Sequence, residues 1–346
     1  MPTTTLKKCT ECALPAEFGR YCEVCGGDLD EGVQATDHTW KSSAATETNA
    51  DHPGGSGDHV ELDLSVIAAA TDVGKRHHYN QDAVAIGAVG GRRIAVICDG
   101  VSNATDSERA ALAGAEAAVT EIEQALKDGE NMEKASRRGV NAAHTAVATV
   151  GAQYPQSPPS STYVSAIVDD TEVVICWVGD SRAYWVGDDD SMCLTVDDTI
   201  AARLEYHGVD ESDERYRSPY AKALLAWLGS DAPSLQPNLA RYIPDSGHIV
   251  VCSDGLSRYM DSPDDLRPLP DGTVGQMAVA LTQQACDYGG ADNISVAITR
   301  FNPPVVGGAT SAPAKSEADE EEYDFTAKLG MGRKKDFTEL LGGGTT

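Results

Sequence analysis

The chain has 346 residues, and its 54 acidic and 27 basic residues give a formal net charge of −27. This acidic excess argues against a protein that binds nucleic-acid backbones or anionic membrane surfaces, because both need dense Lys and Arg. Hydrophobic residues make up 41% of the chain, which is enough for a buried core. No run approaches the ~18 apolar residues of a membrane span, and residues 1–8 contain no apolar signal segment. We therefore expect a soluble, cytoplasmic protein.

Four cysteines lie near the N-terminus as two pairs, Cys9 with Cys12 and Cys22 with Cys25. Four thiolates in two such pairs are typical of a structural zinc site, whose metal supplies the folding energy of a unit too small for its own core. Residues 1–27 are therefore predicted to form a zinc ribbon, with iron or four unligated cysteines as alternatives. Its acidic and basic residues balance, which favours docking to a protein over binding to nucleic acid.

The rest of the chain divides by composition. Residues 28–60 lack apolar periodicity and are predicted to be a flexible linker. Residues 303–346 contain an acidic cluster among Gly, Ala and Ser, so we expect a disordered acidic tail that also docks proteins. Residues 61–302 combine short apolar runs with helical patterns, which predicts an α+β domain. The expected strands are 64–70, 94–98, 163–168, 173–178, 249–252 and 294–299, and the expected helices are 107–126, 132–150, 273–286 and one from Thr195 or Asp197 to Tyr206.

Five aspartates lie at the ends of expected strands: Asp82, Asp99, Asp180, Asp254 and Asp292. Each Asp–Gly or Asp–Asn pair taken alone is compatible with an ordinary turn. If the strand ends converge, however, several anions share one cleft, and hard cations with oxygen ligands stabilise such an arrangement. Mg²⁺ or Mn²⁺ is the natural candidate, and two such ions can activate a water for displacement at phosphorus.

The order of these motifs resembles the metal-dependent protein phosphatases of type 2C, in their compact bacterial form, over residues 61–302. The most complete match runs from Val178 to Tyr184 and reads Val-Gly-Asp-Ser-Arg-Ala-Tyr. The other matching segments are Thr71-Asp72-Val73-Gly74, Asn80-Gln81-Asp82-Ala83, Cys98-Asp99-Gly100-Val101, Leu194-Thr195-Val196-Asp197, Cys252-Ser253-Asp254-Gly255-Leu256 and Asp292-Asn293-Ile294-Ser295-Val296.

The resemblance implies a four-layer sandwich of two antiparallel β-sheets flanked by helix pairs, with two Mn²⁺ or Mg²⁺ at one end. It also implies hydrolysis of phosphoserine and phosphothreonine in proteins by metal-activated water. By position, Asp99 bridges the two ions and the Gly100 carbonyl is a further ligand. Asp254 and Asp292 complete one metal site, and Asp82 holds metal-bound water.

Two positions depart from the family pattern. The Arg that often precedes the first-motif Asn80 by three residues is His77 here, next to Arg76. We expect both in the catalytic site, with His77 either on the phosphate or acting as general acid, and an exposed loop histidine as the alternative. Many members bind a weaker third metal through the residue equivalent to Asp180 and a second aspartate. Arg258 takes the second position, which puts the third metal in doubt or replaces its charge with a guanidinium.

The expected function is dephosphorylation of proteins in signalling, with phosphorylated proteins and their Ser/Thr kinases as partners. One alternative is a pseudophosphatase that binds phosphoproteins without turnover, motivated by His77 and Arg258. The other is an adaptor that acts through its zinc ribbon. The choice between Mn²⁺ and Mg²⁺, the physiological substrate and the oligomeric state are not readable from the sequence.

Overall fold

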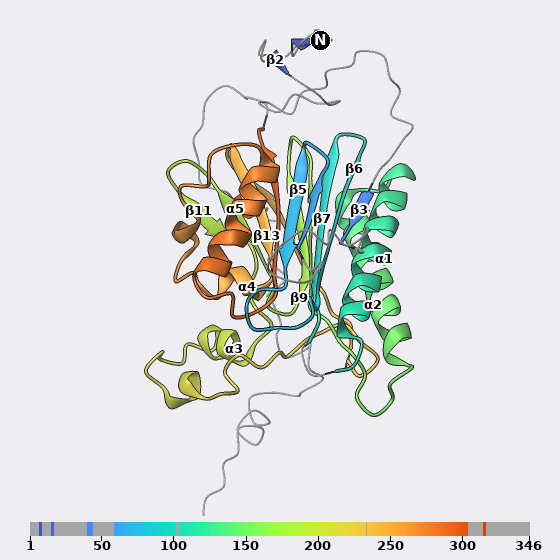
Figure 1. Cartoon of the computed structure of the whole chain (residues 1–346), viewed down its shortest axis with the longest axis vertical. Helices are drawn as coiled ribbons and strands as arrows, with labels where there is room; N and C mark the ends of the chain where they lie inside the picture. Colours follow the sequence, from blue (N-terminus) through green and yellow to red (C-terminus); the bar gives the residue numbers. More distant parts are fainter. Residues whose placement is uncertain are drawn as a thin grey trace, which may run out of the picture.

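A computed structural model describes residues 40–43, 59–101, 104–232 and 234–303, together with the backbone of three two-residue strands (Figure 1). These short strands are β1 (Lys7–Lys8), β2 (Pro15–Ala16) and β15 (Ala314–Lys315). The four cysteines of the predicted zinc ribbon lie outside the described residues. Within the described ranges, no helix has the length and apolar character needed to cross a bilayer.

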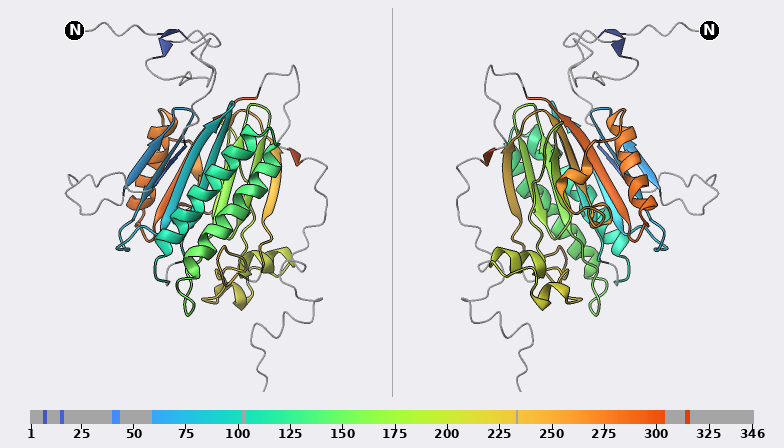
Figure 2. Two further views of the ribbon diagram at one scale, coloured as in Figure 1. Left: turned by 90° about the vertical axis from the view of Figure 1, so that its right-hand side faces the viewer. Right: turned by 90° about the vertical axis from the view of Figure 1, so that its left-hand side faces the viewer.

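The first of two large antiparallel sheets has seven strands and carries a helix pair on its outer face (Figure 2). Its central strands are buried on both faces, which explains why they read as continuous apolar runs without alternation. Helices α1 (Ser107–Lys127) and α2 (Met132–Gly151) approach closely because small side chains line their contact, with Gly139 facing Ile122. In sheet order the strands are β15, β12 (Asn238–Ile243), β9 (Val173–Val178), β8 (Tyr163–Val168), β7 (Arg92–Asp99), β6 (Asp82–Val89) and β3 (Trp40–Ser42).

The second sheet has six strands and is covered by α5 (Val274–Asp287) and the short α4 (Asp254–Ser257). Thr273 caps α5 and forms a reciprocal capping box with Gln276. This helix buries Met277 and Leu281 against the strands. The strands, in sheet order, are β11 (Ser191–Cys193), β10 (Arg182–Val186), β13 (Gly247–Cys252), β14 (Ile294–Phe301), β5 (Ile67–Asp72) and β4 (Val60–Asp63).

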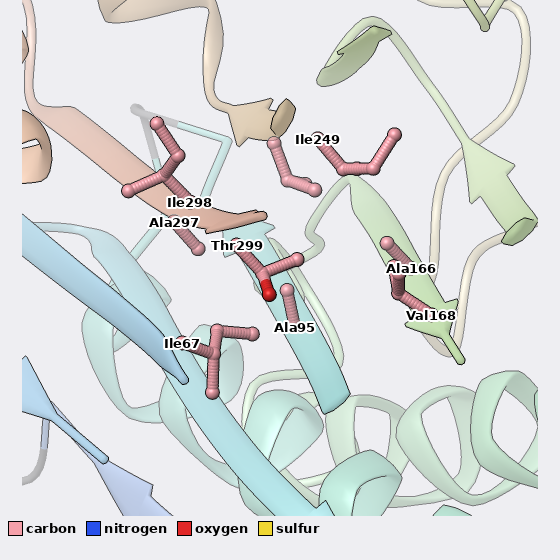
Figure 3. Close-up of a pocket in the computed structure, with 9 residues that line it drawn as sticks. Ile67, Ala95, Ala166, Val168, Ile249, Ala297, Ile298 and Thr299 are labelled. Carbon is pink, nitrogen blue, oxygen red and sulfur yellow. The ribbon is translucent and has the colours of Figure 1, made fainter. Parts of the chain in front are cut away.

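The two sheets pack face to face through an apolar layer that includes Ile86, Ile97 and Ile175. A narrow gap in this layer is lined by small side chains such as Ala95, Ala166 and Ala297 (Figure 3). Its lining offers almost no polar group, so we assign it to imperfect packing and not to ligand binding. The expected sandwich of two antiparallel sheets with helices outside is thus confirmed, and its ends are the places where polar residues gather.

Two predicted boundaries were wrong. The strand expected at 64–70 begins only at Ile67, as part of β5, because residues 64–66 form the turn after β4, with Ser65 at a φ of 67°. There the Leu64 N–H donates to the Ile67 carbonyl oxygen at 3.0 Å. The predicted third helix begins later than expected, as α3 (Ile200–Tyr206) with Thr199 as its cap. Asp197 is outside the helix because its carboxylate forms a fork with the Arg182 guanidinium, at 2.8 Å for both oxygens.

The segment predicted as a linker contains an ordered piece. Trp40–Ser42 forms β3, which pairs with β6 at the edge of the seven-stranded sheet. The Trp40 ring packs against the core beneath α1, and Ser42 Oγ donates to Glu116 on that helix at 2.6 Å. A bulky aromatic in an otherwise polar stretch is therefore an anchor for the sheet edge.

A third group of elements lies at one end of the sandwich. It comprises α3 and the 3₁₀ helix η1 (Glu214–Arg217). A second 3₁₀ helix, η2 (Pro263–Leu266), lies beside β11 instead and packs Leu266 into the core under α5. In Figure 1, α3 and η1 lie below the sheets, at the end where β7 stops. Backbone bridges from Leu228 to Ser161, and from Ser161 to Gly100, connect the segment that follows η1 to the end of β7.

Candidate active site

The aspartates predicted from strand ends come from both sheets. On the seven-stranded sheet, Asp82 opens β6 and stands directly opposite Asp99, the last residue of β7. Residues directly opposite each other on antiparallel strands project to the same face, with Cβ atoms ~5 Å apart. On the six-stranded sheet, β13 ends just before Asp254 and its neighbour β14 begins just after Asp292.

One buried hydrogen bond ties the two groups together. Ser253 Oγ donates to Asp82 Oδ2 at 2.6 Å, and the same Oγ accepts the Ser295 N–H at 3.0 Å. Because Ser253 precedes Asp254 directly, this bond fixes an aspartate of one sheet against an aspartate of the other. Sequence reasoning gave Ser253 no role of its own. The sequence feature that could have indicated a role is a serine at the end of an apolar strand. The structure buries this serine, and buried hydroxyl groups are normally hydrogen-bonded.

Three of these carboxyl groups, those of Asp82, Asp99 and Asp180, hold their protons more tightly than isolated aspartates do. Burial, reinforced by the charges of Asp254 and Asp292, raises the pKa of Asp82 to about 7. Burial and the nearby charge of Asp254 raise the pKa of Asp180 to about 7 as well. Burial and Asp82 together hold the pKa of Asp99 well above its ordinary range. Carboxyl groups are thus clustered where water solvates them poorly. In such a place a nearby cation strongly stabilises the carboxylate form.

The Arg258 guanidinium and the His77 imidazole already lie against the second pair of aspartates. Arg258 Nη2 lies 2.8 Å from Asp254 Oδ2, and Arg258 Nη1 lies 2.8 Å from Asp292 Oδ2. His77 Nε2 lies 3.2 Å from Asp292 Oδ1. The structure thus places His77 against one of the clustered aspartates, whereas the neighbouring Arg76 is exposed on the same loop.

Asn293 fixes the loop that carries His77. Its Nδ2 donates to the carbonyl oxygens of Val73 and Tyr79 at 2.9 and 3.1 Å, and its Oδ1 accepts the Gln81 N–H at 2.9 Å. Its own N–H donates to Asp292 Oδ1 at 3.0 Å. Asn293 thus contacts Asp292 through its backbone, while its side chain holds the loop over residues 73–81.

Close backbone contacts explain two of the motif glycines. A Cβ on Gly100 would lie 2.8 Å from the Gln81 carbonyl oxygen and 2.9 Å from that of Ser107. A Cβ on Gly255 would lie 1.8 Å from the Asn293 carbonyl oxygen, so any larger residue at position 255 would force the backbone at Asn293 to move. Glycine at these positions allows the strand ends to converge.

The donor atoms gathered here fit divalent metal ions. Carboxylate and carbonyl oxygens are the ligands that Mg²⁺ and Mn²⁺ prefer. Asp82 Oδ1 is buried and has no hydrogen-bond partner among the described residues, and such an acceptor is costly unless a cation or water satisfies it. In the part of the chain that the structure describes, no three Asp, Glu, His or Cys side chains are already arranged as the ligands of one ion.

We predict that the metal-free protein shows a stability cost from Asp82 that grows with pH. A carboxyl whose pKa rises from 3.8 to about 7 on folding binds its proton more tightly in the folded chain. Proton binding by Asp82 therefore stabilises the folded state fully below pH ~4, and this contribution is lost as the pH rises to ~7. Urea unfolding in EDTA at pH 5 and pH 8 should show that Asp82→Asn gains stability relative to wild type at pH 8. His248, whose pKa is lowered by burial, changes stability with pH in the opposite direction. Because His248 is present in both proteins, its effect cancels when the variant is compared with wild type. An equal difference at both pH values would contradict the prediction.

Comparison with known proteins agrees with this arrangement. The family model of Protein phosphatase 2C matches residues 73–285. The chain is 25% identical over 241 residues to the serine/threonine phosphatase stp of Listeria innocua, covering 67% of this chain and 94% of that protein. It is 26% identical over 253 residues to the serine/threonine protein phosphatase PstP of Mycobacterium tuberculosis, covering 70% of this chain and 48% of that protein.

Solved structures show the same fold. The crystal structure of the Mycobacterium tuberculosis phosphatase PstP/Ppp has a TM-score of 0.59 and 23% identity, covering 70% of this chain and 100% of that one. The catalytic domain of PstP in complex with two manganese ions has a TM-score of 0.56 and 23% identity, covering 68% of this chain and 98% of that one. Since the family model spans more than half of a chain with this fold, the chain belongs to the protein phosphatase 2C family.

Proposed function

We propose that this protein hydrolyses phosphoserine and phosphothreonine in other proteins, using two bound divalent metal ions. The observation that carries the proposal is the convergence of Asp82, Asp99, Asp254 and Asp292 at one end of the two sheets. The family, and the relatives given above, which are bacterial serine/threonine phosphatases, support the same reaction.

The proposed metal ligands are Asp99, the Gly100 carbonyl, Asp254 and Asp292, with Asp180 as a further carboxylate nearby. Manganese is supported by the relative whose structure holds two manganese ions, and Mg²⁺ has the same ligand preference. When bound, two such ions supply positive charge to the phosphoryl oxygens and lower the pKa of a water for in-line attack.

The remaining residues position groups around that centre. Asp82 is held by Ser253, and its free Oδ1 is placed to accept a hydrogen bond from a water in the cleft. Asp292 orients the His77 imidazole, whose side chain is 30% exposed and thus reachable by substrate. His77 donates a proton to the departing serine or threonine oxygen, a group that leaves poorly as an alkoxide. Arg76, on the same exposed loop, supplies positive charge for the phosphate at the entrance.

A second candidate is a phosphoprotein-binding pseudophosphatase without turnover. It is favoured by one observation, the Arg258 guanidinium between two of the proposed metal ligands. The experiment on Asp99 separates the two functions, because a pseudophosphatase binds a phosphopeptide but releases no phosphate.

We predict that hydrolysis of a phosphothreonine peptide requires Mn²⁺ or Mg²⁺ and is abolished by EDTA. Asp99→Asn should lower kcat/KM by more than about 100-fold, because even the outer partners of metal ligands are worth about 10- to 100-fold. Asp189→Asn, on an exposed turn, serves as the matched control and should keep full activity. A folded wild-type protein that releases no phosphate with excess Mn²⁺ would refute the enzymatic proposal.

His77 is tested through its dependence on the leaving group. His77→Gln should lower kcat for a phosphothreonine peptide by about 100-fold, in the range of general acid catalysis. Hydrolysis of p-nitrophenyl phosphate should change much less, because p-nitrophenolate leaves without a proton. Equal losses with both substrates would assign His77 to phosphate binding instead, and no loss would make it a simple loop residue.

The N-terminal segment is assigned a docking role. Cys9, Cys12, Cys22 and Cys25 bind one structural Zn²⁺ in a ribbon over residues 1–27, and the ribbon and the acidic tail over 303–346 recruit phosphoproteins or their kinases in the cytoplasm. The catalytic domain spans 61–302, after the linker over 28–60. We predict close to one zinc per chain by elemental analysis and none after Cys9→Ser with Cys12→Ser. Equal zinc in both proteins would exclude the ribbon.

A further inference from the structure

Arg258 is fixed at the proposed metal centre by both its backbone and its side chain. It follows the last residue of α4, and its N–H donates to the Asp254 carbonyl oxygen at 2.9 Å. Four residues along a helical turn bring a side chain back over its starting point. The Arg258 fork therefore returns to the Asp254 carboxylate, in a position where its side chain is only 23% exposed.

The same guanidinium reaches a second carboxylate from a different part of the chain. Asp254 follows β13, whereas Asp292 precedes β14, and Arg258 bonds to the Oδ2 atom of each at 2.8 Å. Without it, these two aspartates would face each other across neighbouring strand ends, with the His77 imidazole as the other partner of Asp292. The guanidinium thus joins the two ligands that the six-stranded sheet contributes.

Charge balance shows what such a cation does to metal binding. The five aspartates of the cluster carry five negative charges when ionised. Two divalent ions together with Arg258 supply five positive charges, so the centre is neutral with two ions bound. Removing Arg258 would leave the same centre with one excess negative charge, which attracts divalent ions more strongly.

We propose that Arg258 is a built-in competitor for the metal ions of this centre. It holds Asp254 and Asp292 together in the metal-free protein, and divalent ions must take these carboxylates against its charge. The inference rests on the proposed metal site and goes beyond it, because it assigns a low metal affinity, and hence a dependence on metal supply, to this chain. Arg258 is in this sense a positioning residue that acts through the two carboxylates.

Two effects of removing Arg258 oppose each other. The carboxylates lose the partner that orders them, which weakens metal binding, and the ions lose a neighbouring positive charge, which strengthens it. The second effect dominates, because a bound ion itself holds both carboxylates in place. We therefore expect Arg258→Met to lower the Mn²⁺ dissociation constant at least ~10-fold, with Arg258→Lys, which keeps the charge, close to wild type.

The test measures Mn²⁺ binding directly, without substrate, by the electron paramagnetic resonance signal of free Mn²⁺. Arg138→Met is the matched control, because Arg138 also bridges two carboxylates, Glu121 and Glu130, but on the helix pair α1–α2. Its Mn²⁺ affinity should equal that of wild type. Thermal unfolding gives a second readout: Arg258→Met should unfold at a lower temperature than wild type in EDTA and regain the difference in saturating Mn²⁺.

The outcomes separate this inference from the proposed function. If folded wild-type protein binds no Mn²⁺, the metal site and the inference fall together. If wild type binds Mn²⁺ and Asp99→Asn does not, the site is supported, and equal or weaker binding by Arg258→Met then overturns the inference alone. Should Arg258→Met not fold in EDTA, Arg258→Gln keeps a hydrogen-bond donor without the charge and supplies the same comparison.

Discussion

Repulsion between carboxylates is the constraint around which this structure is organised. Asp82, Asp99, Asp180, Asp254 and Asp292 are gathered at one end of a sandwich, and burial raises the pKa of the first four of them. Like charges in a poorly solvated place cost free energy unless something opposes them. Here Ser253 bonds to Asp82, Arg258 bonds to Asp254 and Asp292, and His77 lies against Asp292. Divalent ions at the proposed metal centre would supply further positive charge.

The apolar layers supply the force that holds these anions together. The two sheets pack through an apolar interface, and α1, α2 and α5 close their outer faces. Burial of such surfaces is the dominant favourable contribution to folding. A centre whose own electrostatics are unfavourable can persist only where the surrounding core fixes the strand ends, and here each strand end is continuous with a buried strand.

Arg258 is the residue on which the proposed metal dependence of this chain rests. A guanidinium that joins two ligands in the absence of metal stabilises the empty centre and raises the metal concentration needed to fill it. The electrostatic repulsion within the anionic site is then opposed partly by a fixed residue and partly by bound ions, whose contribution depends on the metal concentration. Such a division links the activity of the enzyme to metal availability without any additional domain.

Most of the architecture was predictable from local pattern, and the exceptions have physical causes. Long amphipathic helices and doubly buried strands were placed within a residue or two, because their periodicity and caps are encoded locally. The break at Ser65 and the late start of α3 were missed, because a left-handed residue and a fork between Arg182 and Asp197 decided them. The edge strand at Trp40 was missed for the same kind of reason, since its partner β6 lies far along the chain.

The sequence by itself singled out the residues that are proposed to carry the chemistry, because acidic residues at the ends of apolar strands are a local signal and their order resembles one family. Tertiary structure alone decided which of them meet and what they meet. Only folding could bring Ser253 onto Asp82, the Asn293 amide onto the loop over 73–81, and Arg258 between Asp254 and Asp292. Hydrogen bonds and ion pairs between residues distant in the chain depend on packing that no local window contains, and it is these contacts that turn a set of aspartates into a site.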